Sequence, residues 1–246
     1  MRKRNVKRAI LLFLALPLVA IASWQILPLL PSKPFDMLRQ ADPRANHVPA
    51  EKWSKIASPT QAGWDANALD GVLAYAEQIN TDALVIVRHG AVVAAFGRYR
   101  EPLRMHSVRK SLMNVTLGTL VASGKLDTSR TLADLGIDDL QGLSDAEKRA
   151  SIHTLLMSKS GVYHPAAYET RGMRERRPPR GTYAPGEFWY YNNWDFNVLV
   201  SIFNQLAEAD FFEHFAREIA RPLQMQHFDI SHTQYFYEHE VSNHPA

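Results

Sequence analysis

The 246-residue sequence contains no cysteine. This absence excludes a disulfide framework, a zinc site built from thiolates and a lipid anchor attached through cysteine. The ten histidines form no H-x-x-x-H or H-E-x-x-H pair, the spacing with which a helix holds zinc. We therefore expect no metal and no other cofactor. Four histidines near the end of the chain are expected to be surface or loop residues: His227, His232, His239 and His244.

The chain also has little net charge. It carries 28 Lys and Arg against 25 Asp and Glu, a formal charge of +3, and much of the basic excess lies in the first eight residues. The charge therefore indicates no nucleic-acid partner. Hydrophobic residues make up 46% of the sequence, which is enough to form a core in a chain of this length. We expect a globular protein.

The N-terminal 30 residues have the pattern of an export signal. Basic residues at 2–8 precede an apolar run at 9–22, and Ala20-Ile21-Ala22 has the small-x-small form of a cleavage site. Hydrophobicity resumes up to Leu30, so the segment also approaches the roughly 20 residues that cross a bilayer. Residues 1–30 are predicted to be a signal peptide or a membrane anchor. In either case the remainder is expected to be exported, either periplasmic or held at the inner membrane by the N-terminus.

Residues 31–62 carry repeated prolines without a sustained hydrophobic period, which predicts a tether. The folded domain is expected to cover 63–246. Apolar spacing predicts a helix over about 65–79 and a β-hairpin formed by 83–87 and 91–96. A long apolar helix follows, and Gly124 supplies its C-terminal cap.

Ser107 and Lys110 form the only S-x-x-K tetrad in the sequence, at the start of that helix. A spacing of three places both side chains on one face, where an amine can take the proton of a hydroxyl. Burial of the helix would lower the pKa of Lys110 toward that of a usable base. In a structural interpretation, Ser107 is instead an N-cap and Lys110 a solvated residue. Ser111 is a rival nucleophile, but no lysine stands three residues after it.

Tyr190 and Asn192 stand two apart, just before a second predicted helix. In extended backbone such residues point the same way, so we expect a phenol and a carboxamide to project into one cleft. The alternative is that the neighbouring aromatic residues form a core cluster. A Ser-His-Asp site on a nucleophile elbow is not indicated, because the sequence contains no G-x-S-x-G.

Together these motifs resemble the serine β-lactamase and penicillin-binding-protein superfamily, in the branch with class C β-lactamases, carboxylesterases and 6-aminohexanoate-dimer hydrolases. Ser107-Val-Arg-Lys110 is similar to its first motif and Tyr190-Tyr-Asn192 to its Y-x-N, although Tyr191 stands where the family usually has a small residue. The segments 124–127, 155–161, 185–192 and 221–225 resemble recurrent family segments in the same order. The resemblance implies an α+β fold of the β-lactamase/transpeptidase type, with an antiparallel sheet flanked by helices and a mostly helical subdomain.

The family's third motif, Lys or His followed by Thr or Ser and Gly, does not occur after Asn192. Lys159-Ser160-Gly161 fits the letters but precedes Tyr190. The resemblance therefore implies that the C-terminal strands are missing and that this chain is an incomplete domain and a poor catalyst. The alternative is a truncated non-catalytic homologue that acts as a binding or scaffold protein.

For a complete site, the resemblance implies a serine hydrolase that acts on a small-molecule ester or amide through an acyl-enzyme. Ser107 is the expected nucleophile, Lys110 its base, Tyr190 the proton relay and Asn192 the group that orients the substrate. The backbone N–H of Ser107 would donate to the oxyanion. A β-lactamase or a D-Ala-D-Ala carboxypeptidase is a narrower alternative.

Overall fold

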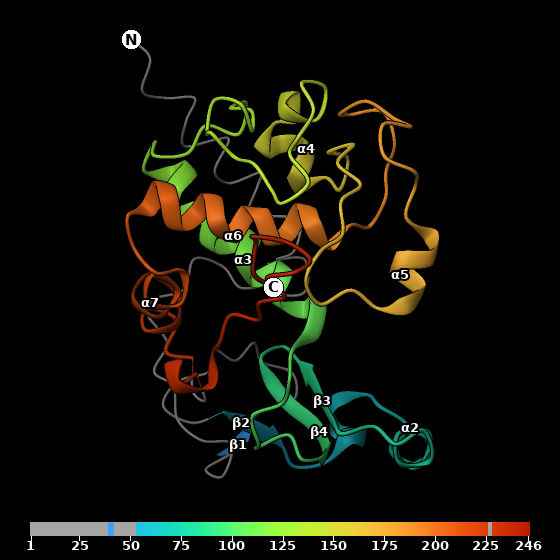
Figure 1. Ribbon diagram of the computed structural model, residues 1–246. Coiled ribbons are helices and arrows are strands. Elements are labelled where there is room, and N and C mark those ends of the chain that lie inside the picture. Colours follow the sequence, from blue (N-terminus) through green and yellow to red (C-terminus); the bar gives the residue numbers. More distant parts are fainter. Residues whose placement is uncertain (1–38, 42–52, 226–227) are drawn as a thin grey trace. The chain divides into compact units, whose positions relative to one another are not determined.

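The computed structural model describes residues 39–41, 53–225 and 228–246 (Figure 1). The predicted signal peptide or anchor lies outside the described residues. No helix within the described ranges has both the length and the apolar character that a membrane span requires. The chain divides into two compact units, which are described separately: residues 1–105 with 216–232, and residues 106–215 with 233–246.

The first unit contains a four-stranded sheet in the order β1-β2-β4-β3. Its strands are β1 (Arg39–Ala41), β2 (Ser54–Ile56), β3 (Ala83–Arg88) and β4 (Ala91–Gly97). The predicted hairpin is present as β3 and β4, which pair antiparallel, whereas β1 pairs with β2 and β2 with β4 in parallel. The sheet is therefore mixed and not wholly antiparallel. Its parallel part comes from within the proline-rich segment, where strands of three residues are too short to show a period in the sequence.

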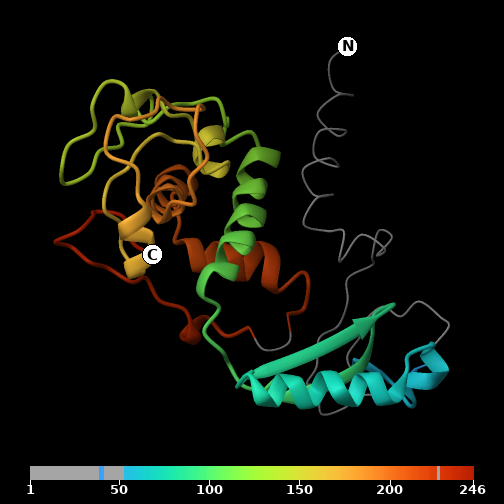
Figure 2. The same cartoon turned by 90° about the vertical axis from the view of Figure 1, so that its right-hand side faces the viewer.

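The hairpin turn uses two residues in the left-handed region, His89 at φ 49° and Gly90 at φ 77°. Two such residues form the primed turn whose twist matches that of paired strands. Helix α2 (Ala66–Gln78) begins after Asp65, whose carboxylate accepts a hydrogen bond from the N–H of Ala68 at 3.1 Å. The helix lies along the sheet (Figure 2) and packs Leu69 into a cluster with strand residues. That cluster comprises Ile56, Ala62, Leu69, Ala91, Val93 and Ala94.

The first unit also contains two 3₁₀ turns, Pro59–Ala62 and Ile230–His232, and a π turn at Ala216–Ala220. The second unit is helical. Its helices are α3 (Arg109–Ala122), α4 (Ile152–Leu156), α5 (Arg171–Arg176), α6 (Asn193–Ala207) and α7 (Phe211–Phe215), with 3₁₀ turns at His106–Val108 and Glu147–Arg149.

Helices α3 and α6 lie side by side and form the core of the second unit (Figure 1). Leu117 and Leu120 of α3 meet Leu199 and Phe203 of α6 in one buried cluster. The buried residues of α3 recur at three- and four-residue spacing and form one stripe, whereas α6 is buried around most of its circumference. This packing fixes the N-terminal ends of both helices, and the site described below lies there.

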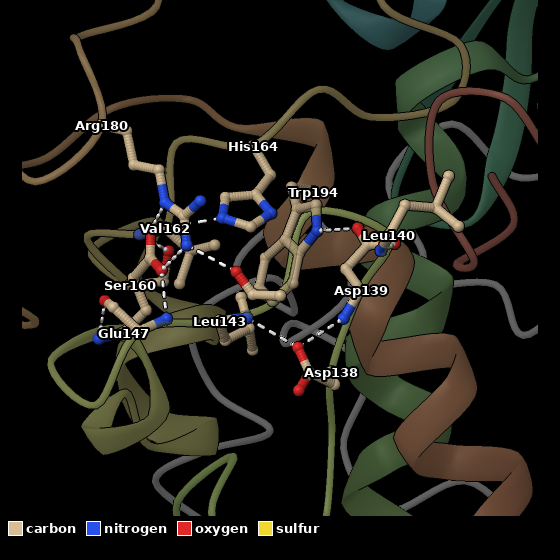
Figure 3. A network of polar contacts seen from close by, with 12 residues as sticks. Asp138, Asp139, Leu140, Leu143, Glu147, Ser160, Val162, His164, Arg180 and Trp194 are labelled. Atoms are coloured by element: carbon tan, nitrogen blue, oxygen red, sulfur yellow. Dashed lines mark hydrogen bonds and ion pairs between the residues drawn. The ribbon is translucent and has the colours of Figure 1, made fainter.

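A buried polar network supports the first turn of α6 (Figure 3). The carboxylate of Asp139 accepts hydrogen bonds from Trp194 Nε1 at 2.7 Å, Ser242 Oγ at 2.8 Å and the N–H of Asn243 at 2.7 Å. These bonds lower the pKa of Asp139 although burial acts to raise it. The carboxylate of Asp139 thus connects the C-terminal segment, residues 233–246, to α6 at Trp194, which is fully buried.

A second part of the network joins Glu147 to Arg180 and His164 (Figure 3). Arg180 donates to both carboxylate oxygens of Glu147, at 2.9 and 2.7 Å, and His164 Nε2 lies 3.3 Å from Oε1. Burial lowers the pKa of His164 in spite of the neighbouring carboxylate. The imidazole is therefore held largely neutral at neutral pH.

Candidate active site

Ser107 and Lys110 lie together at the start of α3, as their spacing predicts. Ser107 is in the 3₁₀ turn His106–Val108, and Lys110 is in the first turn of the helix. Lys110 Nζ lies 3.2 Å from Ser107 Oγ. The lysine side chain is buried, so it is not the solvated residue of the structural interpretation. Ser111 is exposed on the same helix.

Two further groups contact the lysine amine. Lys110 Nζ lies 2.8 Å from the hydroxyl of Tyr191 and 2.7 Å from Asn193 Oδ1. It also lies 4.5 Å from the ring centre of Tyr191 and 5.0 Å from that of Phe196. The amine is thus surrounded by a hydroxyl, a phenol, a carboxamide oxygen and two aromatic faces.

Tyr190 and Asn192, the residues chosen from the sequence, are not part of this cluster. The hydroxyl of Tyr190 donates to the carbonyl of Met173 at 2.7 Å. Asn192 is buried, and its Nδ2 donates to the carbonyl of Val162 at 2.6 Å and to Asp195 Oδ1 at 3.1 Å. The placement of these two side chains beside Ser107 was therefore wrong.

The error is a shift of one residue. The run Tyr190-Tyr191-Asn192-Asn193 contains two overlapping tyrosine-x-asparagine triplets, and the sequence alone does not distinguish them. Asn192 is the N-cap of α6, where its Oδ1 accepts from the N–H of Trp194 at 3.2 Å. A capping side chain satisfies a free amide of the helix and is not available to a neighbouring cleft. The unusually large Tyr191 at the middle position was the sequence signal for the other triplet.

Burial acts most strongly on Lys110 and lowers its pKa, and the charge of Arg109 lowers it further. The hydrogen bond and charge of Tyr191 act in the opposite direction. For Tyr191 itself, burial acts to raise the pKa. Hydrogen bonds from Lys110 and Ser107 and the charges of Lys110 and Arg109 outweigh burial, so the pKa of Tyr191 is lowered overall. The pKa values of both groups are therefore lowered, so each gives up its proton at a lower pH than it would in water.

Arg109 supplies positive charge next to this cluster. Its Nη2 donates to Asn197 Oδ1 at 3.2 Å, and burial lowers its pKa. The charges of Tyr191 and Tyr168 act in the opposite direction and raise the pKa of Arg109. Because guanidinium stays charged in proteins, Arg109 favours a phenolate at Tyr191 and an uncharged amine at Lys110.

Within the described ranges, no three His, Asp or Glu side chains gather as metal ligands. His239 stacks on Tyr237, and His244 is buried with Nδ1 2.9 Å from Ser201 Oγ. His244 lies in a loop, as expected, but it is buried and not at the surface. His227 lies outside the described residues. Among the residues that the structure describes, no strand follows α6.

The chain is similar to several solved structures. A penicillin-binding-protein homologue from Pyrococcus abyssi, described as octameric, aligns with a TM-score of 0.51 and 19% identity over 74% of this chain and 50% of its own. SurE with D-Leu aligns at 0.49 and 21% over 70% of this chain and 42% of its own. EstCE1, a hydrolase with promiscuous acyltransferase activity, aligns at 0.43 and 17% over 74% and 58%.

The chain thus spans about half the length, or less, of the first structures it matches. No curated protein matches it. The family model described as Beta-lactamase matches residues 60–240, which include both helices of the site and most of the described chain. The fold is accordingly of the β-lactamase/transpeptidase type, and the chain belongs to the beta-lactamase family.

Proposed function

We propose that this chain carries the acylating residues of a serine hydrolase that acts on a small-molecule ester or amide. The observation that supports this most is the position of Lys110 Nζ, within 3.2 Å of Ser107 Oγ and within 2.8 Å of both Tyr191 and Asn193. Ser107 is the nucleophile, and Lys110 with Tyr191 forms the base that activates it. Asn193 holds the amine.

Counting donors and acceptors gives the direction of proton transfer. Asn193 Nδ2 donates to the carbonyl of Tyr168 at 2.9 Å, so its Oδ1 faces Lys110 and can only accept. A neutral amine has two N–H bonds and one lone pair. One N–H is directed to Asn193 and the second to the oxygen of Tyr191. The single hydroxyl proton of Ser107 can then be donated to the lone pair of Lys110 or to the oxygen of Tyr191, because both groups lie next to it. This is the polarity that a general base needs.

The proposed reaction has two stages. As Ser107 Oγ bonds to the carbonyl carbon, its proton passes to the pair Lys110 and Tyr191, which delivers it to the leaving oxygen or nitrogen when the C–O or C–N bond breaks. Water then gives a proton to the same pair and attacks the acyl carbon. Ser107 Oγ leaves and regains its proton, and the carboxylic acid is released.

The backbone N–H of Ser107 lies at the helix start, where the dipole favours the negative charge of an oxyanion. A second donor is expected from the strand that carries the third motif, and the sequence after Asn193 lacks that motif. Loss of one such donor costs roughly 10²–10³ in rate. We therefore expect slow turnover from this chain, with acylation easier to detect than steady-state hydrolysis.

The test is intact-mass analysis of the purified chain after incubation with a fluorophosphonate, followed by peptide mapping. A single adduct on Ser107 supports the proposal. Ser107→Ala should abolish the adduct, and the matched variant Ser111→Ala should retain it. An adduct that persists in Ser107→Ala, or wild-type protein that unfolds cooperatively and takes no label, would refute it.

Residues 193–246 do not contain the third motif, so a second candidate is a non-catalytic homologue that binds a ligand or scaffolds a partner. Folded, unlabelled protein is the result this candidate predicts. It also predicts that replacing Lys110 changes stability alone.

We also propose export of the chain, on the basis of the basic and apolar pattern of residues 1–30. The pattern predicts a periplasmic protein or one held at the inner membrane. Fractionation of cells that express the full chain, with the N-terminus of the recovered protein sequenced, distinguishes cleavage at residues 20–22 from an uncleaved anchor. Recovery of uncleaved protein in the cytoplasm would contradict this proposal.

A further inference from the structure

Tyr168 lies in a loop of the second unit with an unusual backbone. Its φ is 64°, and His106 has a φ of 45°. Residues with a Cβ rarely adopt this left-handed region, and they persist there only where surrounding contacts hold them. His106 directly precedes Ser107. Two strained residues from distant parts of the sequence therefore lie near the proposed nucleophile.

The two side chains contact each other. The hydroxyl of Tyr168 lies 3.0 Å from His106 Nδ1, and the rings stack with centroids 6.1 Å apart and planes inclined by 25°. This contact joins the turn that carries Ser107 to a loop some 60 residues later. Through its side chain, His106 is thereby held at a positive φ from which the backbone alone would relax.

The backbone of Tyr168 makes the second connection. Its carbonyl accepts the hydrogen bond from Asn193 Nδ2 at 2.9 Å. An amide that rotated by 180° would place its oxygen against this carbonyl and its NH₂ against the lysine amine. The carbonyl of Tyr168 therefore determines that Asn193 presents an acceptor to Lys110.

Tyr168 is itself held from outside the site. Its N–H donates to Glu238 Oε2 at 3.1 Å, and its ring packs edge-on against Phe236 at 5.2 Å. Both partners belong to the C-terminal segment, which Asp139 ties to α6 through Ser242. The loop is thus held by the C-terminal segment as well as by its contacts to His106 and Asn193.

We propose that Tyr168 is a positioning residue for acylation, whose hydroxyl holds His106 in the turn before Ser107 and whose carbonyl orients the amide of Asn193 toward Lys110. This inference deepens the proposed function and rests on it. Tyr168 acts through its neighbours and transfers no proton of the reaction.

The first experiment measures fluorophosphonate labelling of the full chain at saturating probe, recording rate constant and amplitude separately. Tyr168→Phe removes only the hydroxyl and should slow labelling about three- to tenfold, the effect of one lost hydrogen bond, with full amplitude. Tyr237→Phe is the matched control, since this exposed tyrosine stacks on His239, and should label at the wild-type rate. A merely structural role would lower amplitude and leave the rate of the folded fraction unchanged, which would overturn the proposal.

Variants at His106 separate the ring from the backbone. His106→Gly relieves the positive φ and His106→Ala does not, while both remove the contact to Tyr168. If the ring contact positions Ser107, both variants slow labelling, and adding Tyr168→Phe to either causes little further loss. If His106→Gly is labelled at the wild-type rate, the ring of His106 is not needed to position Ser107.

A readout that does not depend on reactivity separates failure of this inference from failure of the proposed function. The side-chain NH₂ signals of Asn193, observed by NMR, should exchange slowly with solvent in wild type. They should exchange at least tenfold faster in Tyr168→Ala, because loss of the ring contacts to His106 and Phe236 releases the backbone that carries the accepting carbonyl. Unlabelled wild-type protein would refute the serine hydrolase, and with it any role in acylation. Labelled protein whose Asn193 signals and labelling rates are unaffected by changes at Tyr168 would refute the inference alone.

Discussion

Lys110 Nζ lies 2.7 Å from Asn193 Oδ1, a contact between the first turn of α3 and the first residue of α6. The residues are 83 positions apart, and packing of the two helices brings their N-terminal ends together. Asn193, and not the neighbouring Asn192, therefore completes the surroundings of the lysine.

Variants of the two tyrosines distinguish directly between the two overlapping tyrosine-x-asparagine triplets. Tyr191→Phe removes the hydroxyl 2.8 Å from Lys110 Nζ and should slow labelling of Ser107 by roughly 10²-fold, at the lower end of acid–base effects. Tyr190→Phe removes only the bond to the carbonyl of Met173 and should change the rate less than threefold. Labelling rates of the two purified variants, compared at one pH, check this. The opposite ranking would restore the register first expected from the sequence.

The asparagine pair should separate stability from reactivity. Asn192→Ala removes the N-cap of α6 and a buried partner of Val162, so the free energy of unfolding should fall by about 1–2 kcal/mol. Asn193→Ala should slow labelling more than Asn192→Ala does, measured on the folded protein. Urea denaturation followed by circular dichroism gives the first quantity. A larger labelling defect in Asn192→Ala than in Asn193→Ala would contradict the assignment.

Replacing the lysine should remove the base and retain the fold. Lys110→Met keeps the length of the side chain and its buried stem, and labelling should fall by 10²–10⁴-fold. Lys125→Met, at an exposed position after α3, serves as the control and should label as wild type. Labelling of Lys110→Met within a factor of ten of wild type would mean that Tyr191 activates Ser107 without it.

The pH dependence of labelling should report the charge of Arg109. The rate should rise with pH as the pair Lys110 and Tyr191 loses its shared proton. Arg109 lowers the pKa of both groups, so Arg109→Gln should move this rise to higher pH, leaving labelling slower on the acidic side and least affected at high pH. Arg149→Gln, in the 3₁₀ turn Glu147–Arg149, is the control and should not move it. A shift toward lower pH would contradict the electrostatic role.

Asp195 predicts a pH-dependent stability. Burial raises the pKa of this carboxyl to about 8, although Ser160 Oγ donates to its Oδ1 at 2.5 Å. Because the folded pKa lies above the unfolded value, the folded state binds the extra proton, so the stabilising contribution of this one carboxyl is greatest below about pH 4 and is lost as pH rises toward 8. Asp195→Asn keeps the Oδ1 acceptor and removes the charge. Denaturation at several pH values should show that the free energy of unfolding falls less between pH 5 and 8 in the variant than in wild type. An equal fall in both proteins would mean that the pKa of Asp195 is not raised.

The local features of the fold follow from the sequence because they depend on neighbouring residues. The spacing of Leu69 and its neighbours predicts α2, and Asp65 is its cap. Arg88-His89-Gly90 predicts the hairpin turn, and Gly124, at φ 75°, follows the end of α3. Ser107 and Lys110 also meet through one helical turn, so their contact is local.

The strand β2 was not predictable in this way. Its three residues, Ser54–Ile56, form a strand because β1 and β4 pair with them, and their own pattern carries no period. The mixed sheet is therefore a result of long-range pairing. The same holds for His244, which is buried against Ser201 by the return of the C-terminal segment.

The sequence by itself determined the pair Ser107 and Lys110 and the presence of a tyrosine-x-asparagine run before α6. Only the tertiary structure decided which tyrosine and which asparagine face the lysine. The reason is physical: adjacent residues point in different directions, so rotating the start of α6 by one position exchanges the buried cap with the group beside Lys110. That rotation is set by Asn192 capping the helix and by Trp194 bonding to Asp139, contacts made across the fold.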